Sequence, residues 1–208
     1  MKIYGLRAPL PFLKSHVRHV RPIWLMEEIG AAYDVHYLDL EKEEEASPTY
    51  LAVNPFGKVP ALEDGAVKMC ESGAICSYLA DKHGKLIPRA GTPERALHDQ
   101  WMYASVAMIE PHTVRLLAAD FFYKDEPEAP LMKSMALESL EENLPPIEAQ
   151  LAKTAYIAGN DFTVADVMMT ATLRLASHTD LFAKYPKISA YIAKNAARPA
   201  FQRAAEQQ

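Results

Sequence analysis

The sequence predicts two domains, an α/β domain followed by an all-helical domain. Segments with strand and helix patterns alternate up to residue 83, and no segment with a strand pattern follows residue 92. The stretch between them, "GKLIPRAGTP", is rich in Gly and Pro, which is typical of linkers. We therefore expect domains at residues 1–83 and 93–208, joined by a linker at 84–92.

The first domain opens with a β-α-β pattern. "KIYGL" and "YDVHYLDL" have the pattern of strands, and "RPIWLMEEIG" between them carries apolar residues at helical spacing. Gly30 predicts the end of this helix, because glycine readily adopts the left-handed conformation found there. Pro22 indicates that the helix starts only near Arg21, because proline is tolerated in a first turn and not in a helix interior.

A β-β-α pattern completes the first domain. "SPTYLAVNP" predicts a short helical turn, and "PALED" and "VKMC" predict two strands joined at Asp64-Gly65, a strong hairpin signal. "ESGAICSYLADKHG" then predicts a helix that ends at Gly84. The order βαβ-ββα, with Pro60 opening the third strand, is the thioredoxin-like arrangement.

The second domain carries clear helix signals. Thr92-Pro93 predicts an N-cap followed by proline at the first helical position. We expect Pro111 to kink the first long helix and Pro145-Pro146 to interrupt the next one. "Thr163-Val164-Ala165-Asp166" is a capping box, so we expect it to support folding rather than binding.

Composition excludes several classes of protein. Half of the residues are hydrophobic and the net charge is -5, which favours a globular protein and argues against nucleic acid as the main partner. No apolar run reaches the ~20 residues of a membrane span, and the N-terminus lacks the apolar core of a signal peptide, so we expect a cytoplasmic protein. Cys70 and Cys76 have neither redox nor zinc spacing, and we expect both to be reduced.

Four pieces of the chain, in this order, resemble the cytosolic glutathione S-transferases of the bacterial type. They are "NPFGKVPALEDG", "ESGAICSYL", the Gly/Pro-rich linker into a helical half, and "GNDFTVADV". The resemblance implies glutathione as cosubstrate, no metal, a small hydrophobic electrophile as second substrate, and a homodimer. Transferase activity is the function it favours. A non-catalytic binding protein and a glutathione-dependent isomerase or dehalogenase remain alternatives, and the lack of a cysteine in the loop before the first helix disfavours a disulfide reductase.

The resemblance also implies which residues bind glutathione. A cis Val59-Pro60 bond would turn the backbone N–H and C=O of Val59 outward to pair with the cysteinyl part of the tripeptide. Ser72, at the start of a helix, would bind the γ-glutamyl carboxylate, and Glu71 the ammonium group. Lys58 would meet the glycyl carboxylate. A trans Pro60 on an edge strand, a Ser72 that only caps its helix and a solvated Lys58 are the structural alternatives.

The residue that stabilises the thiolate is harder to locate. In the family resembled it is a Ser, Tyr or Cys in the loop before the first helix, and here that loop is several residues longer than expected. Counting back from "RPIWLMEEIG" places Ser15 and His16 at or next to this position, and Ser15 is the candidate. A cationic environment made of His16, His19, Arg7 and Arg18 is the alternative. For the second substrate we expect an apolar pocket lined by Tyr103, Met108, His112 and "DFFY" at 120–123.

Overall fold

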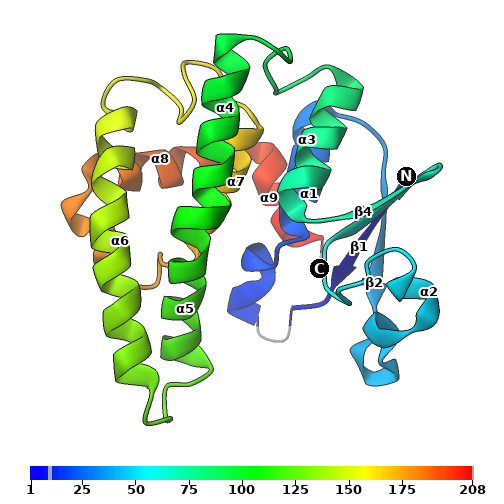
Figure 1. The fold of residues 1–208 in the computed structure, drawn as a ribbon, viewed down its shortest axis with the longest axis horizontal. Coiled ribbons are helices and arrows are strands. Elements are labelled where there is room, and N and C mark those ends of the chain that lie inside the picture. The colour runs from blue at the N-terminus through cyan, green and yellow to red at the C-terminus, as the bar shows by residue number, and fades with distance from the viewer. Residues whose placement is uncertain (9–10, 208) are drawn as a thin grey trace. The chain divides into compact units, whose positions relative to one another are not determined.

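The computed structural model describes residues 1–8 and 11–207, so part of the loop before the first helix and the last residue of the predicted second domain lie outside it (Figure 1). The chain divides into two compact units. The first contains Met1–Ile87 and Arg198–Gln208, and the second contains Pro88–Ala197. The predicted fold class is confirmed: a four-stranded sheet with helices is followed by a helical unit.

The first unit is built on a mixed sheet with the strand order β2-β1-β3-β4. Its strands are β1 (Lys2–Leu6), β2 (Asp34–Leu38), β3 (Ala61–Asp64) and β4 (Val67–Cys70). β1 runs parallel to β2 and antiparallel to β3, and β3 and β4 form the predicted hairpin. Because neighbouring residues of a strand face opposite ways, Tyr4 and its partner Ala61 face one side of the sheet, and Ile3 and its partner Leu62 face the other.

Helices cover both faces of this sheet. Figure 1 shows α1 (Val20–Ile29) and α3 (Ser72–His83) beside each other on one side and the short α2 (Pro48–Leu51) on the other. Leu38, Tyr50, Val53 and Ala61 form the core on the α2 side. Three short 3₁₀ segments, η1 (Pro11–His16), η2 (Leu40–Lys42) and η3 (Glu44–Ala46), complete the connections.

The start of α1 agrees with the prediction made from Pro22. The helix begins at Val20, which places Pro22 in the first turn. There the N–H that proline lacks has no intrahelical acceptor, so nothing is lost. Gly30 and Gly84 end α1 and α3 in left-handed conformations, with φ of 75° and 61°.

The C-terminal helix differs from the predicted domain boundaries. The sequence groups residues 198–208 with the helical domain, whereas α9 (Pro199–Glu206) belongs to the first unit. The Phe201 ring lies 4.9 Å from the ring of Trp24 on α1, and Arg198 forms two hydrogen bonds to the Glu28 carboxylate, of 2.5 and 2.8 Å. The amphipathic pattern of α9 predicts a buried face, but it contains no information about which helix that face will contact.

Apart from an isolated antiparallel bridge between Tyr156 and Gly159, the described residues of the second unit form only helical elements. They are α4 (Pro93–Ala104), the π-helical turn η4 (Ser105–Ile109), α5 (Glu110–Phe121), α6 (Ala129–Leu151), α7 (Val164–Arg174), the 3₁₀ segment η5 (Leu181–Lys184) and α8 (Pro186–Ala196). Most of α7 is buried, and Figure 1 shows α5 and α6 side by side. No helix in the described part of the chain is long and apolar enough to span a membrane.

The two proline sites in this unit behave differently. Pro111 lies in the first turn of α5, directly after η4, and a wider π turn removes the clash that the proline ring would make with a regular preceding turn. Pro145 and Pro146, in contrast, lie inside a continuous α6, so the expected interruption is wrong. Leu144 and Ile147 on either side are buried, and this packing outweighs the ~3 kcal/mol cost of proline in a helix.

The predicted capping box at the start of α7 is present. The carboxylate of Asp166 accepts hydrogen bonds from the Thr163 N–H at 2.9 Å and the Thr163 hydroxyl at 3.1 Å. It also accepts from the Ile157 N–H and the Tyr191 hydroxyl, both at 2.8 Å. Burial raises the pKa of Asp166, and these hydrogen bonds oppose that shift.

Candidate functional site

The backbone around Val59 is oriented for binding an extended ligand. The Val59-Pro60 bond is cis, as predicted. The Lys58 carbonyl accepts hydrogen bonds from the Tyr50 hydroxyl and from Asn54 Nδ2, both at 2.5 Å. Because the C=O and N–H of one trans peptide point in opposite directions, the Val59 N–H points away from these two side chains. Among residues 1–8 and 11–207, neither the N–H nor the C=O of Val59 has a backbone hydrogen-bond partner.

Asn54 and Gly57 hold the turn that leads to Val59. The Asn54 side chain is buried and its Oδ1 accepts from the Phe56 N–H at 3.0 Å. Gly57 has φ of 60°, and a Cβ there would lie 3.0 Å from the carbonyl oxygen of Glu45. A side chain at this position would therefore be strained both by φ and by contact. Lys58 extends from this turn with an exposed side chain.

The N-terminus of α3 is open. Glu71 precedes the helix with φ of 70° and ψ of 111°, and its side chain makes no capping hydrogen bond. The Glu71 carbonyl accepts from the Ile75 N–H at 2.9 Å, so the N–H groups of Ser72, Gly73 and Ala74 precede the first helical hydrogen bond. A positive φ costs a residue other than glycine of order 1–3 kcal/mol and is found most often at binding sites. Free N–H groups and the helix dipole make this terminus favourable for an anion.

A buried arginine, for which the sequence pattern predicts only a place at the start of α1, lies beside Ser72. Arg21 on α1 is 2% exposed, and its Nη1 donates to Ser72 Oγ at 3.0 Å. Ser72 is itself 4% exposed. The signal that could have found Arg21 is a charged residue within the apolar run from Val20 to Met26, since a buried charge needs a specific partner.

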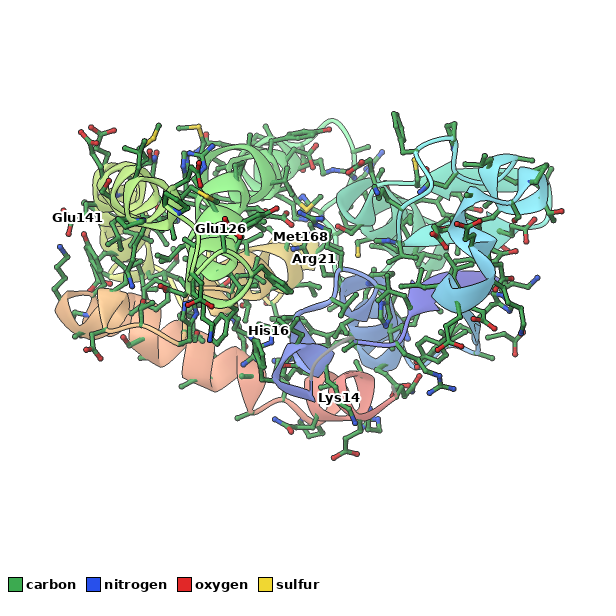
Figure 2. The ribbon with its side chains drawn as sticks, turned by 90° about the horizontal axis from the view of Figure 1, so that it is seen from below. Lys14, His16, Arg21, Glu126, Glu141 and Met168 are labelled. Carbon is green, nitrogen blue, oxygen red and sulfur yellow. The ribbon has the colours of Figure 1, made fainter. Side chains whose placement is uncertain are left out.

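Ser15 and His16 lie together on η1, next to α9 (Figure 2, where Lys14 and His16 are labelled on the same segment). His16 Nδ1 lies 3.0 Å from the Phe12 carbonyl oxygen and 3.3 Å from Ser15 Oγ. A carbonyl can only accept, so this nitrogen is a donor, and the contact with His16 does not use the Ser15 hydroxyl proton. The assignment of Ser15 to the thiolate stays a prediction.

His19, one of the alternative cations, is not a cation at neutral pH. It is fully buried, and burial lowers its pKa to about 4. Its ring packs against Gly5, where a Cβ would lie 2.8 Å from His19 Cγ, and against the Tyr37 ring at 5.7 Å. Arg7 contacts the same tyrosine, with its guanidinium 5.2 Å from the Tyr37 ring centre. Arg18 is exposed.

Neither cysteine is a candidate thiolate. Both are free, and burial raises the pKa of each, for Cys76 to about 12. The Glu71 charge raises the pKa of Cys70 further. No group of three or more His, Cys, Asp or Glu side chains in the described residues could hold a metal ion.

The residues predicted to contact the second substrate all lie in the second unit. Tyr103 of α4 is 69% exposed and Met108 of η4 is 49% exposed, while His112 of α5 is half-buried. Burial, followed by the charge of Arg115, lowers the pKa of His112. Their contact with a substrate stays a prediction, as does that of residues 120–123.

The fold and the site define a thioredoxin-like protein with a helical second domain, a backbone segment at Val59 that is unpaired within the described chain, and an uncapped helix N-terminus at Ser72. The glutathione S-transferase N-terminal domain model matches residues 13–81, and the glutathione S-transferase C-terminal domain model matches residues 113–206. The chain is 33% identical to a probable glutathione S-transferase, GSTF2, of Oryza sativa subsp. japonica, over 99% of this chain and 95% of that protein. The chain belongs to the glutathione S-transferase family.

Two solved structures of this family are similar over almost the whole chain. Glutathione transferase F7 from Populus trichocarpa has a TM-score of 0.84 at 26% identity and covers 99% of this chain and 97% of its own. A glutathione transferase family member from Pseudomonas fluorescens, with two glutathione bound, has the same score and identity and covers 99% of this chain and 92% of its own. The fold predicted from the resemblance is therefore confirmed, and the second protein binds the ligand that the resemblance implies.

Proposed function

We propose that this protein is a glutathione transferase that binds glutathione on its first unit. The observation that carries the proposal is the pair of Val59 backbone groups that have no backbone partner among the described residues, in the same unit as the open N-terminus of α3. The Val59 groups suit the backbone of an extended peptide, and the N-terminus of α3 suits a carboxylate. Glutathione, a tripeptide with a carboxylate at each end, offers both.

Each part of glutathione has a matching group. The Val59 N–H and C=O pair antiparallel with the cysteinyl residue, beside Pro60. The N–H groups at the start of α3 and the Ser72 hydroxyl bind the γ-glutamyl carboxylate, while Glu71 binds the neighbouring ammonium group. Lys58, exposed on its turn, meets the glycyl carboxylate.

The chemical step is attack by the glutathione sulfur on an electrophilic carbon of a small hydrophobic cosubstrate. A C–S bond forms and the leaving group departs with its electron pair. Lowering the pKa of a free thiol, ~8.5, by about two units requires about 2.7 kcal/mol of preferential thiolate stabilisation. A hydroxyl hydrogen bond to the sulfur, from Ser15 in this proposal, supplies a large part of it. Tyr103, Met108 and His112 contribute to the binding of the cosubstrate.

The family also supports a homodimer and a cytoplasmic location as parts of this proposal. Glutathione is consumed as a cosubstrate and not retained as a prosthetic group. A non-catalytic glutathione-binding protein is the outcome expected if the unusually long loop before α1 does not bring a hydroxyl to the sulfur.

Two measurements test the proposal. In a calorimetric titration we expect saturable binding of reduced glutathione at one site per chain. In an assay with chlorodinitrobenzene, we expect Ser15→Ala to lower the rate about 10- to 100-fold, the value of a hydrogen bond to a charged group, while the glutathione affinity stays within about twofold. Ser134→Ala, which removes an exposed hydroxyl on α6, is the matched control.

The outcomes separate the alternatives. Absence of glutathione binding would overturn the proposed function. Binding without turnover of any electrophile would leave the binding-protein function. Turnover that is unchanged in Ser15→Ala would show that another group stabilises the thiolate.

A further inference from the structure

Arg21 and Ser72 form a buried pair in the first unit that joins α1 to the first residue of α3 (Figure 2 labels Arg21). The guanidinium also lies near the next turn of α3, where its charge partly offsets the effect of burial on the pKa of Cys76. Ser72 and Cys76 are four residues apart and therefore share one face of α3, the face that packs on α1. Arg21 is thus held against this face, with its donor directed to the N-terminal end.

The hydrogen bond from Arg21 determines the role of the Ser72 hydroxyl. A guanidinium has no acceptor, so Ser72 Oγ must accept from it. The serine proton then remains for a second partner, and Ser72 donates to no atom among the described residues. A polar side chain so nearly buried with an unused proton is expected to have an acceptor when the site is filled.

We propose that Arg21 is a positioning residue of the glutathione site, which orients the Ser72 hydroxyl so that its proton is donated to the γ-glutamyl α-carboxylate. This inference rests on the proposed function. Arg21 acts through Ser72: it removes one acceptor lone pair of Oγ, fixes the rotamer of the side chain and makes the O–H a stronger donor through polarisation. The N–H groups at the start of α3 complete the binding of the same carboxylate.

Arginine suits this position better than lysine. Its planar guanidinium can donate to Ser72 from one nitrogen and still use its other N–H groups elsewhere, and it keeps its charge when buried. An ammonium group at the end of a lysine side chain is more strongly hydrated and loses its proton more readily in a buried position.

The test compares two ligands that differ in one group. Reduced glutathione and γ-aminobutyryl-cysteinylglycine, which lacks the γ-glutamyl α-carboxylate, are titrated calorimetrically into the full chain. For the unmodified protein we expect glutathione to bind more tightly by about 10- to 100-fold, the usual contribution of hydrogen bonds to a charged group.

Arg21→Met removes the donors and keeps an apolar stem of similar length. We expect it to lower the glutathione affinity about tenfold and to leave the affinity for the analogue within about twofold. Ser72→Ala should behave in the same way, and Arg21→Met combined with Ser72→Ala should bind glutathione within about twofold of Ser72→Ala alone, because the two residues act in one interaction. Arg89→Met, which removes an exposed arginine, is the matched control for the change in net charge.

Three results would overturn the inference. Arg21→Met could weaken both ligands equally, which would make Arg21 a structural residue only. The losses in Arg21→Met and Ser72→Ala could multiply in the double variant, which would make the two residues independent. If Arg21→Met does not fold, Arg21→Lys is measured instead, alone and combined with Ser72→Ala. The inference would be contradicted if Arg21→Lys kept the ratio of the glutathione affinity to the analogue affinity found in the unmodified protein, and if the losses of glutathione affinity in the two single variants multiplied in the combined one. Failure of the unmodified protein to bind glutathione would overturn the proposed function itself, so the two failures are distinguishable.

Discussion

The N-termini of α7 and α3 differ in what satisfies the first backbone N–H groups of the helix, which have no intrahelical acceptor. At α7, Thr163 and Asp166 form a capping box, and the Asp166 carboxylate also accepts from Ile157 and Tyr191. At α3, Glu71 makes no capping hydrogen bond, and the first three N–H groups of the helix precede its first backbone hydrogen bond. The first terminus is completed by the chain itself, and the second is open, as the proposed glutathione site requires. Under the proposed function, a helix that directly follows a strand and lacks a side-chain cap indicates a binding site better than the helix dipole, which both termini share.

The comparison predicts that damage to the α7 terminus reduces stability and not binding. Asp166→Ala leaves four buried donors without their acceptor: the N–H groups of Ile157 and Thr163 and the hydroxyls of Thr163 and Tyr191. We expect a loss of about 4 kcal/mol in the free energy of unfolding, measured in urea, since each unsatisfied buried donor costs about 1–3 kcal/mol. The glutathione affinity of the folded fraction should not change.

Asp166→Asn is the matched variant for this measurement. It keeps one oxygen as an acceptor and should cost clearly less than Asp166→Ala. A loss below about 1 kcal/mol for Asp166→Ala, or an equal loss for both variants, would contradict the role assigned to this carboxylate.

The N-terminus of α1 is a third case, because it has no side-chain cap and is not part of the proposed ligand site. His19 stands at its N-cap position, makes no capping hydrogen bond and is buried, with its pKa lowered to about 4 from 6.5. The folded state therefore binds a proton at His19 less tightly than the unfolded state. The contribution of neutral His19 is complete above pH 6.5 and is lost as the pH falls from 6.5 towards 4, up to about 3 kcal/mol.

The measurement is the free energy of unfolding between pH 7 and pH 4 for the unmodified protein and for His19→Gln. The glutamine does not titrate, so the difference between the two curves isolates His19 from other groups, among them His98, whose pKa burial also lowers. As the pH falls from 6.5 towards 4, we expect the unmodified protein to lose more free energy of unfolding than His19→Gln does. Parallel curves would mean that His19 is exposed to protonation in the folded state.

Local chemistry explains which parts of the site the sequence could predict. The start of α3 at Ser72, the glycines that end α1 and α3, and the turn before Pro60 depend on a few adjacent residues, whose conformational preferences are strong. Arg21, the burial of His19 and the packing of α9 on α1 depend on residues from different elements, so no short pattern contains them. The continuous α6 is of the same kind, because the packing of Leu144 and Ile147 outweighs the local effect of two prolines.

At Glu71, the requirements of ligand binding and of folding stability oppose each other. Its φ of 70° is costly for any residue with a Cβ and costs glycine nothing. Glu71→Ala removes the carboxylate and keeps the strain, whereas Glu71→Gly removes both. In the proposed site both variants lose the same partner of the ligand's ammonium group, so we expect them to weaken glutathione binding equally, about tenfold.

Their stabilities should differ, in contrast. We expect Glu71→Gly to be more stable than Glu71→Ala by about 1 kcal/mol in the free energy of unfolding, because relief of the positive φ exceeds the greater chain entropy of glycine in the unfolded state. Equal stabilities would mean that the backbone at Glu71 is not strained, and unequal affinities would mean that the conformation, and not the carboxylate, serves the ligand. If both expectations hold, the α3 terminus keeps a strained residue because that residue binds the ligand, whereas every contact at the α7 terminus serves the fold.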